Sequence, residues 1–123
     1  MNIHESMEDY LETILILSES GKKVRSIDIV RETNYSKPSV SIAMRKLKEK
    51  GLIDIDSHNF ITLTTKGMEI AEKTYDRHKI LTECLVLHGV PRDIAEIDAC
   101  KIEHELSEET YAIIKKFVLD NQK

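Results

Sequence analysis

Hydrophobic residues between positions 26 and 51 recur with the three- to four-residue period of amphipathic helices. Residues 26–33 predict a short helix with Ser26 as its N-cap, and the segment NYSKP then supplies turn-forming residues. Pro38 suits the first turn of a second helix, and Gly51 suits the left-handed position after its end. The apolar stripe of this second helix consists of Val40, Ala43, Met44 and Leu47. The pair predicts a helix-turn-helix.

The next segment, LIDIDSHNFITLT, alternates apolar and polar side chains on both sides of a turn at Ser57, His58 and Asn59. Alternation with a period of two is typical of strands, so this segment predicts a β-hairpin. Beside a helix-turn-helix, such a hairpin is the wing of a winged helix domain, where His58 or Asn59 can reach the DNA backbone. The alternative is a hairpin that only covers the core.

The rest of the chain predicts helices. Residues 66–88 form one long helical pattern that ends at Gly89, Pro91 opens a helix reaching about Leu106, and Ser107 caps a last helix through Leu119. Near the N-terminus, Ser6 is expected to cap a further helix. The C-terminal helices are apolar on more than one face, which favours a homodimer.

We therefore expect a mainly α fold. It combines a winged helix-turn-helix DNA-binding domain in residues 1–72 with a helical metal-binding and dimerisation domain in residues 73–123. A homodimer of this kind would present two recognition helices to a two-fold operator in double-stranded DNA.

Composition narrows the cellular setting. The 123 residues are 41% hydrophobic and 33% charged, which is typical of a soluble, helix-rich chain. No apolar run approaches the roughly 20 residues that span a bilayer, and the start MNIHESMEDY lacks the features of a signal peptide. We expect a cytoplasmic protein without a membrane partner. Cys84 and Cys100 are too few for a disulfide framework, so they are expected to be thiols or metal ligands.

Charge is unevenly distributed along the chain. The net charge is −4, yet residues 22–50 contain nine basic and three acidic side chains, a local charge of +6, which leaves −10 for the remainder. A basic patch on an acidic body is typical of a module that meets phosphates with one face. The alternative is a solvated, lysine-rich helix surface.

Polar and small side chains occupy the face of the second helix opposite its apolar stripe. Its serines and cations can reach base edges or phosphates in a major groove, and Ile42 can touch a thymine methyl group. Arg25, in the basic segment, and His58, in the hairpin, are further candidates for DNA contact. The candidates on the helix face are Ser39, Ser41, Ile42, Arg45 and Lys46.

Candidate metal ligands occur at helical spacing. Asp9 and Glu12 are three residues apart, and Cys100, Glu103 and His104 stand at positions i, i+3 and i+4. Together with His78 in the long helix, these carboxylates and imidazoles suit a divalent transition ion such as manganese or iron. The thiol favours iron, cobalt or zinc.

Each candidate ligand also has a structural explanation. Asp9 stands at a capping-box position after Ser6, Glu12 suits a solvated helix surface, His78 suits a core, and Cys100 can be a small buried hydrophobe. Other metal and nucleotide sites are excluded, because paired CxxC motifs are absent, HELSE is not HExxH, and SGKK lacks the upstream glycine of a phosphate loop.

Five segments together resemble one protein family: SMEDYLETI, YSKPSVSIAMRKLKEKGLI, ITLTTKG, YDRHKIL and ACKIEHELS. Over nearly the whole chain they are similar to the diphtheria toxin repressor and manganese transport regulator family. The resemblance implies a repressor that binds Mn²⁺ or Fe²⁺ and shuts off metal-uptake genes when the metal is replete. It implies as metal ligands Asp9, Glu12, His78, Cys100, Glu103 and His104. It implies as the DNA-reading turn and helix Ser36, Lys37, Pro38, Ser39, Ser41 and Ile42.

The implied ligand set is a hybrid. Manganese-type members share Asp9 and Glu12 but have glutamate where Cys100 stands, whereas iron-type members have the cysteine but methionine in place of Asp9. Binding of Co²⁺ or Zn²⁺ in vitro is compatible with such a set. The iron type also has a C-terminal SH3-like domain, which is not expected within these 123 residues. Its accessory metal site is not expected either, because Thr82 and Glu96 stand in place of the glutamate and histidine of that site.

Two other functions compete with this interpretation. One is a winged regulator that responds to a small molecule. The other is a non-haem metalloenzyme in which His78, Glu103 and His104 form a facial triad. The chain is expected not to be an enzyme, since it offers no second set of acid or base residues.

Overall fold

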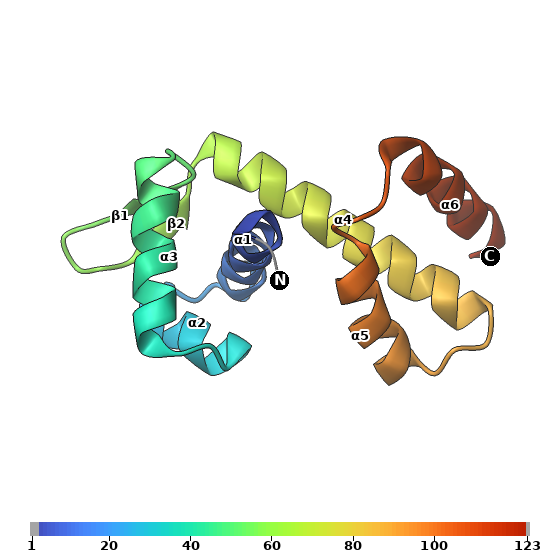
Figure 1. The fold of residues 1–123 in the computed structure, drawn as a ribbon, viewed down its shortest axis with the longest axis horizontal. Helices are drawn as coiled ribbons and strands as arrows, with labels where there is room; N and C mark the ends of the chain where they lie inside the picture. The colour runs from blue at the N-terminus through green and yellow to red at the C-terminus, as the bar shows by residue number, and fades with distance from the viewer. Residues whose placement is uncertain (1–2, 123) are drawn as a thin grey trace. The chain divides into compact units, whose positions relative to one another are not determined.

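The computed structural model describes residues 3–122, with side chains from Ser6 onward (Figure 1). Residues 1, 2 and 123 lie outside the described residues, so the ends of the predicted domain ranges 1–72 and 73–123 are not described. No helix within residues 3–122 is both long enough and apolar enough to cross a membrane. The elements are α1 (Ile3–Glu19), α2 (Ser26–Thr33), α3 (Lys37–Glu49), β1 (Ile53–Ile55), β2 (Ile61–Leu63), α4 (Thr65–Leu87), α5 (Arg92–Ile102) and α6 (Glu108–Asn121).

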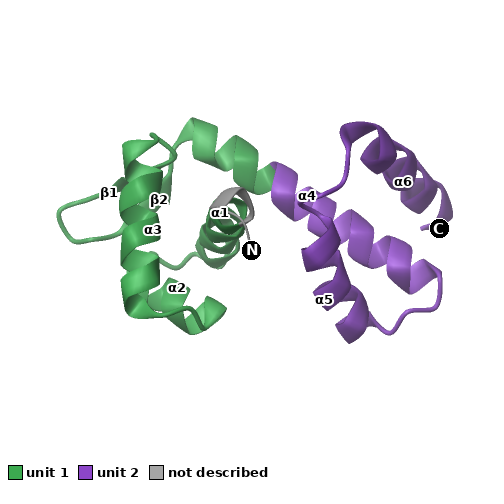
Figure 2. Cartoon of the chain, in the orientation of Figure 1, with its two compact units in different colours: residues 1–72 green, residues 73–123 purple. Residues whose placement is uncertain are grey.

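The chain divides into two compact units, which Figure 2 colours separately. Unit 1 comprises residues 1–72 and unit 2 residues 73–123, so the boundary falls within α4. The predominance of helix and the single small sheet confirm the predicted fold class.

Unit 1 contains α1, α2, α3 and the hairpin. α2 packs against both α1 and α3, while β1 contacts α3 and β2 contacts α1. These elements enclose an apolar core, because each helix directs one hydrophobic stripe inward. The largest fully buried side chains of this unit are Leu11, Ile14, Val24, Ile29, Val40, Met44, Leu47 and Ile53.

Helix α3 has the predicted amphipathic form. Its stripe residues Val40, Met44 and Leu47 are buried, and Pro38 lies in its first turn. Gly51 follows the helix with φ +73°, a backbone conformation that glycine adopts without steric cost. The predictions for both ends of this helix are confirmed.

Two predicted N-caps are wrong. α1 begins at Ile3, so Ser6 lies within the helix and Asp9 is not in a capping box. The N-cap of α2 is Arg25 rather than Ser26, and its backbone N–H donates to Asp28 Oδ2 at 2.9 Å. This bond and the nearby Lys22 ammonium hold the pKa of the Asp28 carboxyl below its usual value.

The predicted hairpin is confirmed. β1 and β2 are antiparallel, with Ile53 opposite Leu63 and Ile55 opposite Ile61. After the hairpin, the first turn of α4 packs directly against the backbone of Leu52. A Cβ at Gly67 would lie only 1.9 Å from the carbonyl oxygen of Leu52. Only glycine fits at this contact.

Unit 2 comprises the rest of α4, α5 and α6. Its buried apolar residues are Leu81, Ala95, Ala99 and Val118. Ser107 caps α6 as predicted, accepting a hydrogen bond from the Thr110 backbone N–H at 3.1 Å. α5, however, ends at Ile102, so the prediction of a helix through Leu106 is wrong.

Candidate functional sites

The exposed face of α3 carries the predicted DNA-reading residues. Polar and cationic side chains are exposed on the side of α3 opposite the buried stripe. Ile42, on the same side, is 45% exposed. A helix with small hydroxyls and flexible cations on one face has the shape and chemistry to enter a major groove. The exposed residues are Lys37, Pro38, Ser39, Ser41, Ile42, Arg45 and Lys46.

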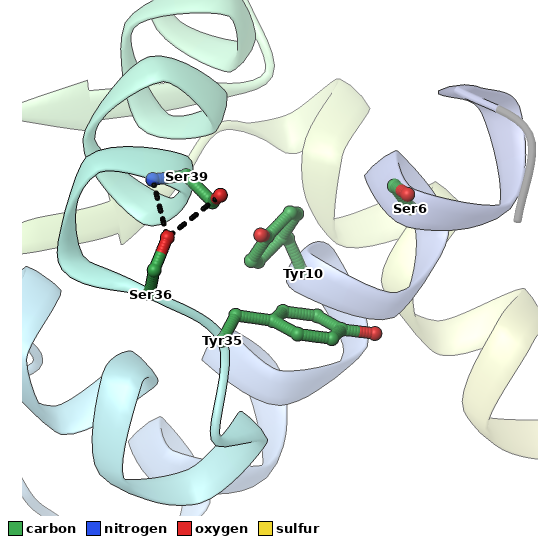
Figure 3. Close-up of a pocket in the computed structure, with 5 residues that line it drawn as sticks. All are labelled: Ser6, Tyr10, Tyr35, Ser36 and Ser39. Atoms are coloured by element: carbon green, nitrogen blue, oxygen red, sulfur yellow. Dashed lines mark hydrogen bonds between the residues drawn. The ribbon is translucent and has the colours of Figure 1, made fainter.

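The start of α3 borders a hollow of about 320 Å³, shown in Figure 3. Ser36 Oγ accepts the Ser39 N–H at 3.2 Å and also lies 2.8 Å from Ser39 Oγ, so Ser36 caps the helix. Tyr35, directly before this cap, meets the buried ring of Tyr10 from α1 edge to face, with ring centres 5.5 Å apart. With Ser6, these residues give the hollow a lining of hydroxyls and rings.

The hairpin turn has a fixed geometry. Asp56 Oδ1 accepts the backbone N–H groups of His58 at 2.8 Å and Phe60 at 3.0 Å, and these bonds lower the pKa of the Asp56 carboxyl. His58 is exposed at the tip. The Arg25 guanidinium lies over the Phe60 ring, 4.3 Å from its centre, and the Lys23 ammonium lies 5.1 Å from the same centre. These cation–π contacts place both cations beside the wing. Phe60 was not among the sequence candidates.

In unit 1, α1 carries two of the predicted metal ligands. Asp9 is half-buried and Glu12 is 8% exposed, and the two stand one helical turn apart. A buried carboxylate is costly unless cations or hydrogen-bond donors compensate its charge. The burial of Glu12 therefore contradicts its alternative interpretation as a solvated surface residue.

In unit 2, three of the predicted ligands come together around one carboxylate. The Glu103 side chain is fully buried, and its Oε2 lies 3.0 Å from His78 Nδ1 on α4. The other oxygen, Oε1, lies 3.4 Å from His104 Nε2, whose side chain is only 3% exposed. Such a buried carboxylate between two imidazoles combines donors that divalent transition ions accept. These three side chains therefore fit a metal of that class.

The structure changes the predicted geometry of this group. Because α5 ends at Ile102, Glu103 is the C-cap of the helix and His104 stands in the following turn. Cys100, one turn before Glu103, is exposed, which contradicts its alternative interpretation as a buried hydrophobe. Neither Cys100 nor Cys84 forms a disulfide, as expected.

Arg77 is a buried neighbour of this group that the sequence predictions missed. Its Nη1 donates to the carbonyl oxygens of Glu103 at 3.0 Å and Leu106 at 2.7 Å, and its Nη2 donates to Glu108 at 3.0 Å. The sequence does contain a signal that Arg77 is buried, because Arg77 falls on the inner stripe of the long helix, between Thr74 and Leu81.

Models of one known protein family match both parts of the chain. The N-terminal DNA binding domain of the iron dependent repressors matches residues 2–59. Their metal binding and dimerisation domain matches residues 64–123. The chain belongs to the iron dependent repressor family. It is thus a metal-activated, DNA-binding transcriptional regulator, in a family of repressors, with a DNA-binding and a dimerisation domain.

Individual relatives of this repressor family are similar along most of the chain. An uncharacterised helix-turn-helix-type transcriptional regulator of Methanocaldococcus jannaschii is 34% identical over 93% of this chain and 93% of its own length. The transcriptional regulator MntR of Escherichia coli is 32% identical over 92% of this chain and 73% of its own.

Solved structures of the repressor family share the fold. A manganese-dependent transcriptional repressor in complex with manganese has a TM-score of 0.86 and 31% identity over 95% of this chain. The manganese regulator SloR has a TM-score of 0.83 and 30% identity over 92% of this chain. The chain spans about half the length of these two proteins, 54% and 53% respectively.

Proposed function

We propose that the activating ion is a divalent transition metal, Mn²⁺ or Fe²⁺, and that Co²⁺ and Zn²⁺ can replace it in vitro. The observation that carries the proposal is the buried Glu103 carboxylate between His78 and His104, within the metal binding domain of the family. The two similar solved structures, a manganese regulator and a manganese-dependent repressor, support the choice of ion. The proposed ligands are Asp9, Glu12, His78, Cys100, Glu103 and His104.

We further propose that residues 1–72 bind DNA and that residues 73–123 bind metal and form a homodimer. Two copies of α3 would then read a two-fold operator in double-stranded DNA upstream of metal-uptake genes, which places the protein in the cytoplasm with the chromosome. The proposed DNA contacts are Arg25, Ser36, Lys37, Pro38, Ser39, Ser41, Ile42, Arg45, Lys46 and His58.

Metal and DNA binding are proposed to be coupled through shared ligands. Asp9 and Glu12 belong to the DNA-binding domain, whereas the other four ligands belong to the metal-binding domain. A site drawn from both domains restricts their motion, so less conformational entropy is lost when DNA binds. By linkage, operator DNA must then raise metal affinity by the same factor by which metal raises operator affinity.

A titration with metals and DNA tests this function. Chelator-treated protein would be mixed with a labelled duplex, selected from a random library in the presence of Mn²⁺, and titrated with Mn²⁺, anaerobic Fe²⁺, Co²⁺ or Zn²⁺. We expect transition ions to strengthen binding by about 1–3 kcal/mol, the usual range of allosteric coupling, and Mg²⁺ to have little effect. His78→Ala and Glu103→Ala should abolish the response while light scattering still shows a folded dimer.

Other outcomes would favour the rival functions. Selective DNA binding that ignores every ion would indicate a regulator of the small-molecule type, with the hydroxyl-lined hollow beside α3 as the first place to search for a ligand. Metal binding without any preference among DNA sequences would favour a metalloenzyme with His78, Glu103 and His104 as its triad. We propose that the protein has no enzymatic activity, so the second outcome is not expected.

A further inference from the structure

Arg77 binds the segment between α5 and α6, which carries the proposed metal ligands Glu103 and His104. Its guanidinium leaves α4 and reaches three acceptors that are 26 to 31 residues further along the chain, all between the end of α5 and the start of α6. Two of them are the backbone carbonyls of Glu103 and Leu106, which bracket His104. Arg77 is only 8% exposed, and the Tyr111 ring covers it at 5.1 Å.

Two adjacent residues of α4 hold Glu103 by different groups. Arg77 binds its backbone carbonyl, whereas His78 contacts its carboxylate. Through Nη1 the guanidinium holds the backbone of Glu103, while the carboxylate of Glu103 faces the two imidazoles. We propose that Arg77 is a positioning residue of the metal site, which holds the turn at residues 103–107 so that Glu103 and His104 face an ion. This inference rests on the proposed function.

A purely stabilising ion pair does not explain these contacts. Glu108 is 67% exposed and also contacts Lys73, so the charged part of the network resembles a surface pair of small value. The carbonyls have a different need, because Glu103 is the C-cap of α5 and Leu106 stands between α5 and α6, so both carbonyls lie outside the regular hydrogen bonds of a helix. The planar fork of arginine can supply several donors to them at once, while lysine offers a single point charge.

The proposal predicts separate effects for charge and for fork geometry. Arg77→Lys keeps the positive charge but loses the fork, so its metal affinity should fall by about 10–100-fold, as is usual when a residue that orients ligands is removed. Arg77→Gln retains one amide donor for a carbonyl and should lose less than Arg77→Met, which retains none.

Matched controls are available in the same unit. Arg92 also pairs with a carboxylate through two nitrogens, at 2.8 and 3.4 Å from Glu83, but it is 55% exposed and these bonds reach α4 instead of the turn at residues 103–107. Arg92→Lys should therefore bind metal as tightly as the wild type. Glu108→Gln removes the charged partner of Arg77 while leaving both carbonyl bonds, so it should change affinity by less than about threefold.

The experiment measures affinity and order separately. Mn²⁺ and Co²⁺ affinities of the full chain would come from competition with a chelator, and amide hydrogen exchange of metal-free protein would report the order of residues 103–107. We expect Arg77→Lys to remain folded by circular dichroism, to exchange faster in this turn and to bind both ions more weakly. Addition of metal should restore slow exchange only at higher concentration.

Several results would overturn the inference. Wild-type metal affinity in Arg77→Lys, an equal loss in Arg92→Lys, or failure of every Arg77 variant to fold would each assign Arg77 a purely structural role. Failure of the proposed function is distinguishable, because His78→Ala and Glu103→Ala would then also bind metal as the wild type does. Loss in those two variants without loss in Arg77→Lys refutes the positioning role alone.

Discussion

The two units of this repressor differ in what they bury and what they expose. Every large, fully buried side chain of unit 1 is apolar, whereas unit 2 contributes Val118 and the carboxylate of Glu103. Unit 2 in turn exposes large apolar side chains on α5 and α6, among them Ile97 at 59% and Ile113 at 72%.

This difference separates two sources of stability. Unit 1 gains its free energy of folding mainly from its own core, so its outward face can carry polar residues for another purpose. Unit 2 buries the Glu103 carboxylate completely and exposes more large hydrophobic side chains than unit 1, and both are costly in an isolated chain. A bound cation would compensate the first cost and a partner subunit the second, which is consistent with a metal binding and dimerisation domain.

The largest expected effect is the loss of a core side chain in unit 1. Leu47 is fully buried, so Leu47→Ala should lower the free energy of unfolding by about 2–5 kcal/mol, measured by urea denaturation with and without metal. Ile113→Ala, in unit 2, is the control, because its side chain is exposed. Equal losses in both variants at a concentration where the protein is monomeric would contradict the contrast between the two units.

The contrast also explains which structural features were predictable from sequence. Unit 1 has local signals that agree with its packing: the stripe of α3, the left-handed Gly51 and the period-two hairpin were all correctly predicted. The N-cap predictions at Ser6 and Ser26 were wrong because they relied on a serine near a helix start, which is too common a signal to fix the boundary. Asp28, three residues after Arg25, was the better signal for the start of α2, because it completes a capping box with Arg25.

In unit 2, the end of α5 could not be predicted from local pattern. The helix stops at Ile102 where the carbonyls of Glu103 and Leu106 accept from Arg77, which lies 26 and 29 residues away in sequence. Pairings of this range leave no periodic trace. The metal-ligand candidates His78, Glu103 and His104 nevertheless lie together in unit 2, because they were chosen by residue type, which depends little on helix boundaries.

A second prediction concerns the choice of metal in unit 2. Cys100→Glu replaces a soft thiolate by a hard carboxylate, so the ratio of Mn²⁺ to Co²⁺ affinity should rise by about tenfold or more. Chelator competition measures the ratio, and Co²⁺ gives an independent signal, since a thiolate ligand produces an intense near-ultraviolet charge-transfer band. Cys84→Ser, on α4, is the control and should change neither measurement. A cobalt spectrum that Cys100→Ser leaves unaltered would remove the thiol from the ligand set.

A third prediction tests the cost of the buried carboxylate. Glu103→Gln keeps the shape of the side chain and removes its charge, so metal-free protein should unfold within about 1 kcal/mol of the wild type or become more stable. Leu47→Ala, which removes apolar contacts of similar burial, provides the reference. Thermal and urea unfolding in the presence of a chelator measure the difference. A large destabilisation by Glu103→Gln would mean that its charge already stabilises unit 2 without an ion.

The smallest predicted effect lies on the exposed face of unit 1. Lys46 is exposed on α3 directly before buried Leu47, so Lys46→Ala should leave stability nearly unchanged. If its ammonium contacts one phosphate, the slope of log affinity against log salt should become shallower by about one unit, for operator and random duplexes alike. Lys116→Ala, which removes another exposed cation, on α6 of unit 2, should not alter the slope.

Ser41→Ala distinguishes phosphate contact from base recognition on the same face. A hydroxyl that meets base edges affects the preference among sequences and leaves the salt dependence unchanged, so this variant should lose discrimination between operator and random duplexes. Fluorescence anisotropy at several salt concentrations measures both quantities. If Lys46→Ala and Lys116→Ala gave the same slope, the basic charge of unit 1 would be a general solvated surface, and α3 would not be the face that meets DNA.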